Sequence, residues 1–140
     1  MKIEKIDHIS FAVKDLEETK RVYREDFGLI PTYQYIAESE KIRVARYDIG
    51  EVAVEFMEST APDGEVAKFI DNRGEGVFLI SYKVDDLSKA MQEFKDKHVK
   101  LIDHQPRELF GTRYAFVHHP NKLHGVLTEL LEGDFDITKQ

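Results

Sequence analysis

The hydrophobic and polar positions of this chain follow two periods in succession, and the succession occurs twice. Residues 8–13 and 79–84 alternate apolar and polar side chains, which is the period of a β-strand. After Asp15 and Asp86 the apolar residues recur at helical spacing instead, and an Asp directly before such a pattern is a typical helix N-cap. The pattern is clearest in the second copy, where one helix face would carry Leu87, Ala90, Met91 and Phe94. Each copy therefore predicts a strand followed by a helix.

The repeat continues beyond the helices, because each helical pattern is followed by three further strand-like segments. In the first copy these segments are 31–36, 41–49 and 51–58, and in the second copy they are 99–103, 112–119 and 124–132. The order strand, helix and three strands, present twice, predicts an α+β fold made of two βαβββ modules that curve around a shared cavity. We expect one domain over residues 1–140, with module one at about 5–58, a connecting helix at about 62–73 and module two at about 76–132.

Strand alternation also predicts which polar side chains face the cavity. It puts the helix-packing side chains of 8–13 on one face and His8 on the other, and it separates Glu55 from its apolar neighbours in the same way. The repeat aligns Glu129 with Glu55 and Leu79 with His8. Buried carboxylates are costly unless they are paired, protonated or coordinated, so two of them near a histidine indicate a divalent-metal site. The alternative is that both glutamates are solvent-facing edge residues and that His8 caps the start of a strand.

The amino-acid composition narrows the classes of partner that the protein is expected to bind. The chain carries 20 Lys and Arg against 27 Asp and Glu, a net charge of −7, which argues against nucleic acid. It has no cysteine, so disulfides and thiolate metal sites are excluded. The opening residues lack the apolar run of a signal peptide, and no later stretch is long enough to span a bilayer. We therefore expect a cytoplasmic protein whose partner is a small molecule.

Several longer motifs resemble one known family. "DHISFAVKDLEE", "VAVEFME", "PDGEVAKFIDNRGEG" and "FVHHPNKLHGVLTELLE" are similar to stretches of the methylmalonyl-CoA epimerases, a branch of the vicinal oxygen chelate (glyoxalase/bleomycin-resistance) superfamily. The resemblance covers about residues 5–132. It implies a bowl of two βαβββ modules around a divalent metal, isomerase or lyase chemistry, and a possible homodimer. The ligand positions that it implies are His8, Glu55, Leu79 and Glu129.

Two positions depart from the family pattern. The third ligand position of the epimerases lies in a motif with two adjacent histidines, but this chain reads "GEGVFLIS", with Phe78 and Leu79 in their place. A second family base falls at or near Val44, which cannot move a proton; Glu38 and Glu40 would replace it only in a different strand register. Three other histidines could be recruited to the site, namely His118, His119 and His124. The alternative is that His119, which matches the family His of an "HP" motif, is structural and that His118 and His124 are surface residues.

Two functional hypotheses follow. In the first, His8, Glu55 and Glu129 hold Co²⁺, Mn²⁺, Zn²⁺ or Mg²⁺, and Glu129 transfers a proton on a small carboxylate or acyl thioester. In the second, the protein is a metal-free member of the superfamily that binds a small ligand without turnover, with Phe78 and Leu79 as pocket walls. The strand arginines are candidates to contact a substrate carboxylate or phosphate, with salt bridges as the alternative: Arg43, Arg46 and Arg113.

Overall fold

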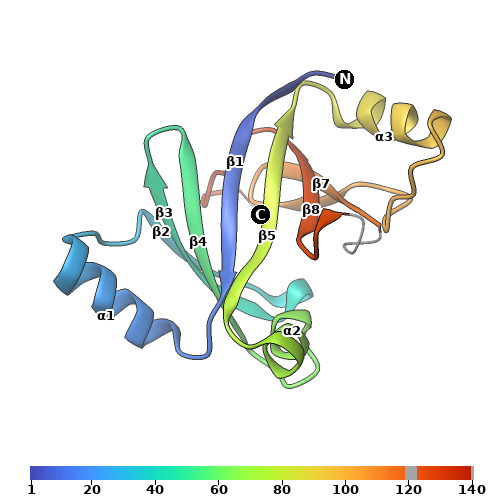
Figure 1. Cartoon of the computed structure of the whole chain (residues 1–140). Helices are drawn as coiled ribbons and strands as arrows, with labels where there is room; N and C mark the ends of the chain where they lie inside the picture. The colour runs from blue at the N-terminus through green and yellow to red at the C-terminus, as the bar shows by residue number, and fades with distance from the viewer. Residues whose placement is uncertain (119–122, 140) are drawn as a thin grey trace. The chain divides into compact units, whose positions relative to one another are not determined.

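The computed structural model describes residues 1–118 and 123–139 and is a mixed α+β fold (Figure 1). The first module contains β1 (Ile3–Ala12), α1 (Leu16–Phe27), β2 (Tyr33–Ala37), the 3₁₀ helix η1 (Glu38–Glu40), β3 (Ile42–Ile49) and β4 (Val52–Ser59). After α2 (Glu65–Arg73), the second module contains β5 (Gly76–Val84), α3 (Leu87–Asp96), β6 (Arg107–Leu109), β7 (Thr112–Val117) and β8 (Leu127–Glu132). Within the described ranges, no helix has both the length and the apolar character needed to cross a bilayer.

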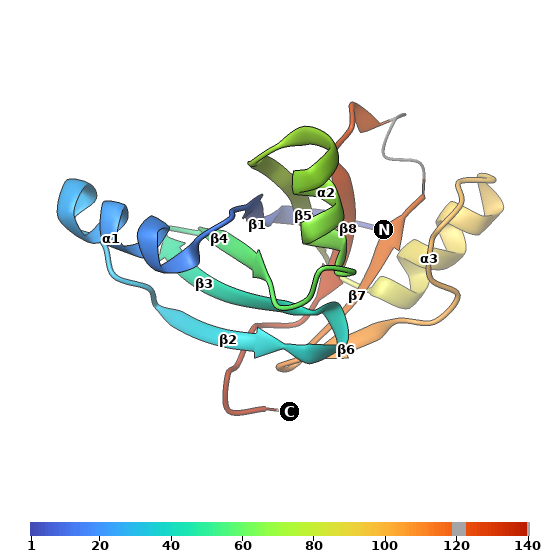
Figure 2. The ribbon, with the colours of Figure 1, turned by 90° about the horizontal axis from the view of Figure 1, so that it is seen from below.

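The two modules have the same internal strand order, which confirms the predicted repeat. The contacts divide the chain into one compact unit over His8–Phe78 and a second that joins Met1–Asp7 to Leu79–Gln140. In the first module the strands are ordered β2-β3-β4-β1, and in the second β6-β7-β8-β5. The first and last strands of each module are parallel, β1 with β4 and β5 with β8, while the other neighbours are antiparallel. Figure 2 shows β2, β3 and β4 side by side in the first module. The α+β class and the two βαβββ modules are thus as the hydrophobic pattern predicts.

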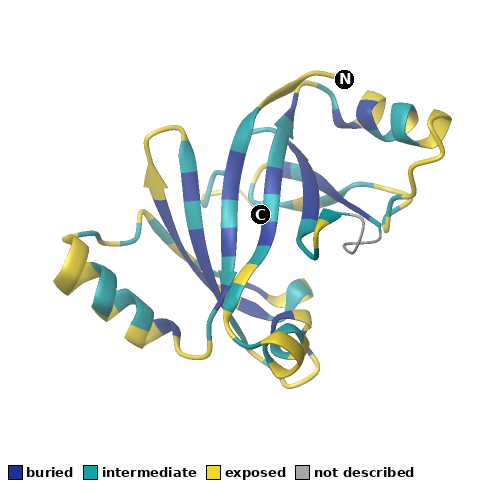
Figure 3. Ribbon diagram, in the orientation of Figure 1, coloured by how far each residue is buried: buried dark blue, intermediate teal, exposed yellow. Residues whose placement is uncertain are grey.

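Each module buries one apolar sheet face against its own helix. In the first module Leu16 of α1 packs with Tyr47 of β3 and Phe56 of β4. In the second, Leu87 of α3 packs with Leu130 of β8. The strands alternate between these helix-facing residues and residues of the opposite face, and Figure 3 shows the alternation as bands along β1. Polar side chains of the opposite face, described below, form the candidate site.

Both module helices begin at the aspartates that the sequence predicts. Asp15 accepts a hydrogen bond from the backbone N–H of Glu18 at 3.1 Å, and Asp86 accepts one from Lys89 at 3.0 Å. Each bond satisfies one of the N–H groups that a helix start leaves unpaired. The predicted N-caps are therefore confirmed.

A strand glutamate adds a second acceptor at each helix start. Glu58, the penultimate residue of β4, accepts from the N–H of Leu16 at 3.0 Å. Glu132, the last residue of β8, accepts from the N–H of Leu87 at the same distance. A carboxylate at a helix N-terminus also interacts favourably with the helix dipole. These equivalent glutamates thus dock each helix onto its own sheet.

The predicted strand at 99–103 is wrong. There, Leu101 makes only an isolated antiparallel bridge with Val117, and the ladder partner of β7 is β6, further along the chain. The carboxylate of Asp103 accepts the N–H of Phe116 at 2.9 Å, so a side chain takes a bond that a continuous strand would make with its backbone. The segment therefore runs beside β7 without becoming a full strand.

Candidate functional site

Glu55 is the centre of a buried polar cluster in the first module. It lies on β4 in register with Ser10 of β1, and its side chain is 2% exposed. The Ser10 hydroxyl lies 3.3 Å from Glu55 Oε1, and His8 Nε2 lies 3.4 Å from the same oxygen. Strand alternation puts His8 and Ser10 on one face of β1, and the parallel register delivers Glu55 to that face. The structure therefore brings His8 and Glu55 together.

The second carboxylate oxygen of Glu55 contacts two other side chains. The Tyr35 hydroxyl of β2 donates to Oε2 at 2.9 Å, and Arg46 Nη1 of β3 lies 3.2 Å from it. The Arg46 guanidinium also contacts Asp48 through Nε, at 3.2 Å from Oδ1. The Arg46 side chain is 9% exposed. Both oxygens of Glu55 are thus engaged by groups from β1, β2 and β3, which offsets the cost of burying its charge.

Glu129 occupies the corresponding place in the second module. It lies on β8 in register with Ser81 of β5, whose hydroxyl donates to Glu129 Oε1 at 2.7 Å. On the other side Glu129 is in register with Phe116 of β7. Leu79 comes two residues before Ser81 on β5, on the same strand face, and is buried. The second module thus keeps the Ser–Glu pair but has a hydrocarbon where His8 would be.

The two clusters correspond residue by residue but differ in chemistry. Glu55 is 2% and Glu129 is 5% exposed, so the alternative of solvent-facing glutamates is wrong. The equivalent pairs are Ser10 and Ser81, His8 and Leu79, and Arg46 and Phe116. The convergence of Glu129 with His8 and Glu55 stays a prediction of the repeat.

The position expected for a second base holds no proton carrier. Val44 is paired with Tyr35 and Met57 and is 1% exposed. Glu38 and Glu40 lie in η1, before β3 begins, so the strand register does not place either of them at Val44.

The other residues considered from the sequence have local roles. Arg43 pairs with Glu58 at 3.3 Å and Arg113 with Glu132 at 3.1 Å, so the salt-bridge alternative describes both arginines. The Phe78 ring packs edge-on against Phe69 of α2, with the ring centroids 5.3 Å apart.

Of the additional histidines, His118 and His124 lie among the described residues. His118 directly follows β7, and its backbone N–H donates to the carbonyl oxygen of Lys100. His124 is exposed and has a left-handed backbone with φ of 60°. His119 lies outside the described residues.

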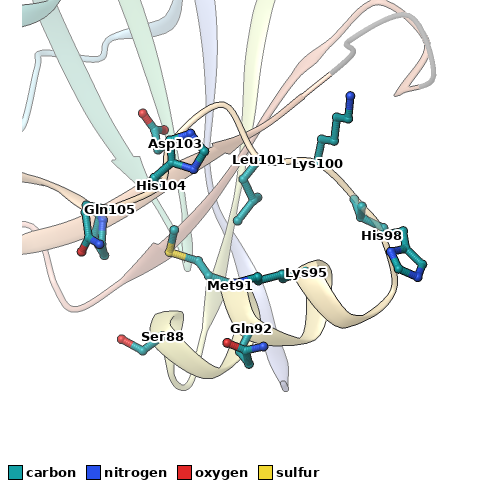
Figure 4. Close-up of a pocket in the computed structure, with 12 residues that line it drawn as sticks. Ser88, Met91, Gln92, Lys95, His98, Lys100, Leu101, Asp103, His104 and Gln105 are labelled. Carbon is teal, nitrogen blue, oxygen red and sulfur yellow. The ribbon is translucent and has the colours of Figure 1, made fainter.

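A cavity of about 790 Å³ lies elsewhere, beside α3 in the second module (Figure 4). In Figure 4 the side chains of Met91 and Leu101 face each other between α3 and the segment that follows it, whereas Lys100 points away. Both Met91 and Leu101 pack against the apolar cluster that contains Leu130. Because Leu130 and Glu129 are consecutive strand residues, they face opposite sides of the sheet. The cavity is thus on the helix side of the sheet, separate from Glu129.

Two donor atoms of the first module have the spacing of two ligands on one divalent metal ion. Two ligand atoms that are each about 2.1 Å from a tetrahedral ion lie about 3.4 Å apart, and His8 Nε2 and Glu55 Oε1 are 3.4 Å apart. An imidazole nitrogen with carboxylate oxygens suits Mn²⁺, Co²⁺ or Zn²⁺. Over the described ranges, no set of three or more His, Cys, Asp or Glu side chains is clustered as an ion would require. Of the expected third and fourth ligands, Glu129 offers oxygen and Leu79 offers none.

Comparison with known proteins agrees with this architecture. Residues 7–116 match a family model for the Glyoxalase/Bleomycin resistance protein/Dioxygenase superfamily. The chain belongs to this superfamily, as the sequence motifs predict.

Two relatives illustrate the range within the superfamily. An uncharacterized Bacillus subtilis protein, YqjC, is 34% identical over 133 residues, which cover 94% of each chain. The mouse mitochondrial methylmalonyl-CoA epimerase is 26% identical over 131 residues, which cover 92% of this chain and 73% of the epimerase.

Solved structures with the same fold include epimerases with acyl-CoA ligands. A variant of the Streptomyces coelicolor methylmalonyl-CoA epimerase in complex with 2-nitronate-propionyl-CoA has a TM-score of 0.87 and 32% identity, with 94% of this chain and 99% of that chain covered. A hypothetical protein from Bacillus halodurans has a TM-score of 0.85 and 31% identity, with 93% and 94% covered. Similarity to the epimerases is thus present in both sequence and structure.

Proposed function

We propose that this protein transfers a proton at a carbon beside the carbonyl group of a small carboxylate or acyl thioester, as an isomerase of the epimerase-like branch. The observation that carries the proposal is the pair of buried glutamates, Glu55 and Glu129, each in register with a serine on the neighbouring strand. A buried carboxylate that faces away from the apolar core is costly, and a general base is one use that accounts for it. The epimerase relatives support the substrate class.

Each residue has a separate part in this proposal. His8, Glu55 and Glu129 would hold a divalent metal, which when bound acts as a Lewis acid toward the carbonyl oxygen. Glu129 takes the proton from one face of the adjacent carbon and later releases it to water, and the configuration is inverted when a proton from solvent reaches the opposite face. Ser81 donates to Glu129 Oε1 at 2.7 Å and so fixes the carboxylate orientation.

A metal-free ligand-binding protein is the second candidate, and two features favour it. Leu79 removes a ligand from the position equivalent to His8, and the guanidinium of Arg46 already accompanies Glu55 at 3.2 Å. Both features make the residues around the glutamates less suited to a cation. In this case Phe78 and Leu79 would form apolar walls of the ligand site.

Metal binding and proton exchange distinguish the two candidates. Protein purified without chelator is analysed for bound metal, stripped, and titrated with Mn²⁺ or Co²⁺ while its unfolding temperature is recorded. Methylmalonyl-CoA is then incubated with each form in D₂O, and deuterium uptake at the carbon between the two carbonyl groups is followed by NMR. Deuterium uptake detects proton transfer even if only one face of the carbon is served by a base.

The isomerase proposal predicts stoichiometric metal uptake and metal-dependent deuterium incorporation. Glu129→Gln should abolish incorporation, while Glu108→Gln, an exposed glutamate of β6 in the same module, should leave it intact. Absence of both uptake and incorporation, with methylmalonyl-CoA still bound in calorimetry, would leave the binding function. Equal incorporation by Glu129→Gln and the unchanged protein would remove Glu129 from the reaction.

A further inference from the structure

We propose that Arg46 determines how strongly this site binds divalent cations, as a fixed positive charge that weakens metal binding at His8 and Glu55. The inference deepens the proposed function, on whose metal ligands it rests. It adds a specificity-determining residue of the protein itself, distinct from the residues that would contact the metal.

The strand register fixes Arg46 beside the metal-ligand candidate. Arg46 of β3 and Glu55 of β4 are directly opposed in the antiparallel ladder. Their side chains meet with Nη1 3.2 Å from Oε2, and they are 9% and 2% exposed. The other oxygen of the same carboxylate lies 3.4 Å from His8 Nε2. A cation between His8 and Glu55 would therefore share one small carboxylate with the guanidinium.

Arg46 is also held in this position from its far side. Its Nε lies 3.2 Å from the Asp48 carboxylate, two residues along β3. Asp48 is itself tied by its backbone N–H, which donates to the Thr32 hydroxyl at 2.9 Å. A guanidinium that bridges two carboxylates loses contacts if it swings away, so it stays close when a second cation approaches.

The positive charge of Arg46 is what would weaken metal binding. A guanidinium remains protonated at any ordinary pH, and two cations on one buried carboxylate repel each other with little screening by solvent. The second module supplies an internal comparison, because Phe116, which is uncharged, is opposed to Glu129 in the equivalent ladder. The residue directly opposed to the buried glutamate is thus charged in the half that carries His8 and uncharged in the other half, where the Arg107 guanidinium lies over the Phe116 ring at 4.9 Å.

The decisive experiment measures Mn²⁺ and Co²⁺ dissociation constants of the stripped protein by isothermal titration calorimetry. Arg46→Gln removes the charge but keeps a hydrogen-bond donor for Glu55, and Arg46→Lys keeps the charge. Arg43→Gln is the matched control, because Arg43 lies on the same strand, pairs with Glu58 and faces the other way. His8→Ala, introduced into each protein, shows whether the measured site is the one proposed. If Arg46→Gln does not fold, Arg46→Met, which keeps an unbranched apolar chain, takes its place.

We expect Arg46→Gln to bind both metals at least tenfold more tightly than the unchanged protein, and His8→Ala to cancel the gain. Arg46→Lys and Arg43→Gln should bind within twofold of the unchanged protein. Loosened packing alone would change affinity in Arg46→Lys as well, so an equal effect of Lys and Gln overturns the inference. The inference is also overturned if Arg46→Gln and the unchanged protein bind metal equally tightly. In that case the metal part of the proposed function is retained. If neither form binds metal, the inference and the metal role of His8 and Glu55 both fall.

Discussion

Leu79→His tests whether the second module can be given the metal ligand that it lacks. Leu79 comes two residues before Ser81, which donates to Glu129, just as His8 comes two residues before Ser10, which lies beside Glu55. The matching registers should bring an imidazole at position 79 as near to Glu129 as His8 is to Glu55, where the separation is 3.4 Å. The substitution should therefore add a nitrogen ligand of the right kind.

Leu79→His should lower the free energy of unfolding in the absence of metal, and bound metal should raise it again. Leu79 is 3% exposed, so its loss costs about 2 kcal/mol of apolar burial, and burying an incompletely paired imidazole costs about 1 kcal/mol more. A total of about 3 kcal/mol lowers the unfolding temperature by roughly 10 °C in a chain of this size. Metal at about 100 times its dissociation constant returns about 2.7 kcal/mol. Metal should thus restore nearly all of the lost stability.

The assay is thermal unfolding, followed by circular dichroism, of stripped protein at increasing Co²⁺ concentration. Ile80→His is the control, since it places a histidine one residue along the same strand and on the opposite face. Only Leu79→His should show the large metal-dependent recovery, together with at least tenfold tighter Co²⁺ binding. A Leu79→His protein that folds but responds to Co²⁺ no more than Ile80→His would refute the assignment of equivalent cavity positions.

Three further predictions test a helix cap, a core side chain and an ion pair of the fold. Asp86→Ala removes the N-cap of α3 and should lower the free energy of unfolding by about 1 kcal/mol, as measured from the urea midpoint. Leu130→Ala, at a side chain only 2% exposed, should cost about 3 kcal/mol in the same assay; a loss under 1 kcal/mol would contradict its place in the core. The ammonium of Lys83 holds the pKa of the Asp134 carboxyl below its usual 3.8, so this contact stabilises the fold above that pH and is lost as the pH falls through the lower folded value. An NMR titration should show the Asp134 pKa rising in Lys83→Met, and an unchanged pKa would rule out the pairing in solution.

The pattern of hydrophobic and polar residues along the chain was sufficient to predict most of the helices and strands and the face to which each strand residue points. Alternation in 8–13 and 79–84, followed by a helix start at Asp15 and Asp86, is repeated in the structure because period and capping depend on neighbours in the chain. The same reasoning failed at 99–103. There the Asp103 side chain accepts the N–H of Phe116, and such a competing bond is invisible to an apolar pattern.

By itself the sequence determined the doubled βαβββ order and the helix starts. It also determined that His8, Glu55 and Glu129 lie on the strand faces opposite the apolar, helix-packing residues, since each of these features follows from spacing along the chain. Only the tertiary structure decided what surrounds Glu55. The sequence offered Arg46 as one of three strand arginines and did not single out Tyr35. Both reach Glu55 because β2, β3 and β4 pair in one register, and a shift by a single residue would turn them to the opposite face. Register is set by packing across strands, so the charge beside a buried acid is a property of the folded sheet.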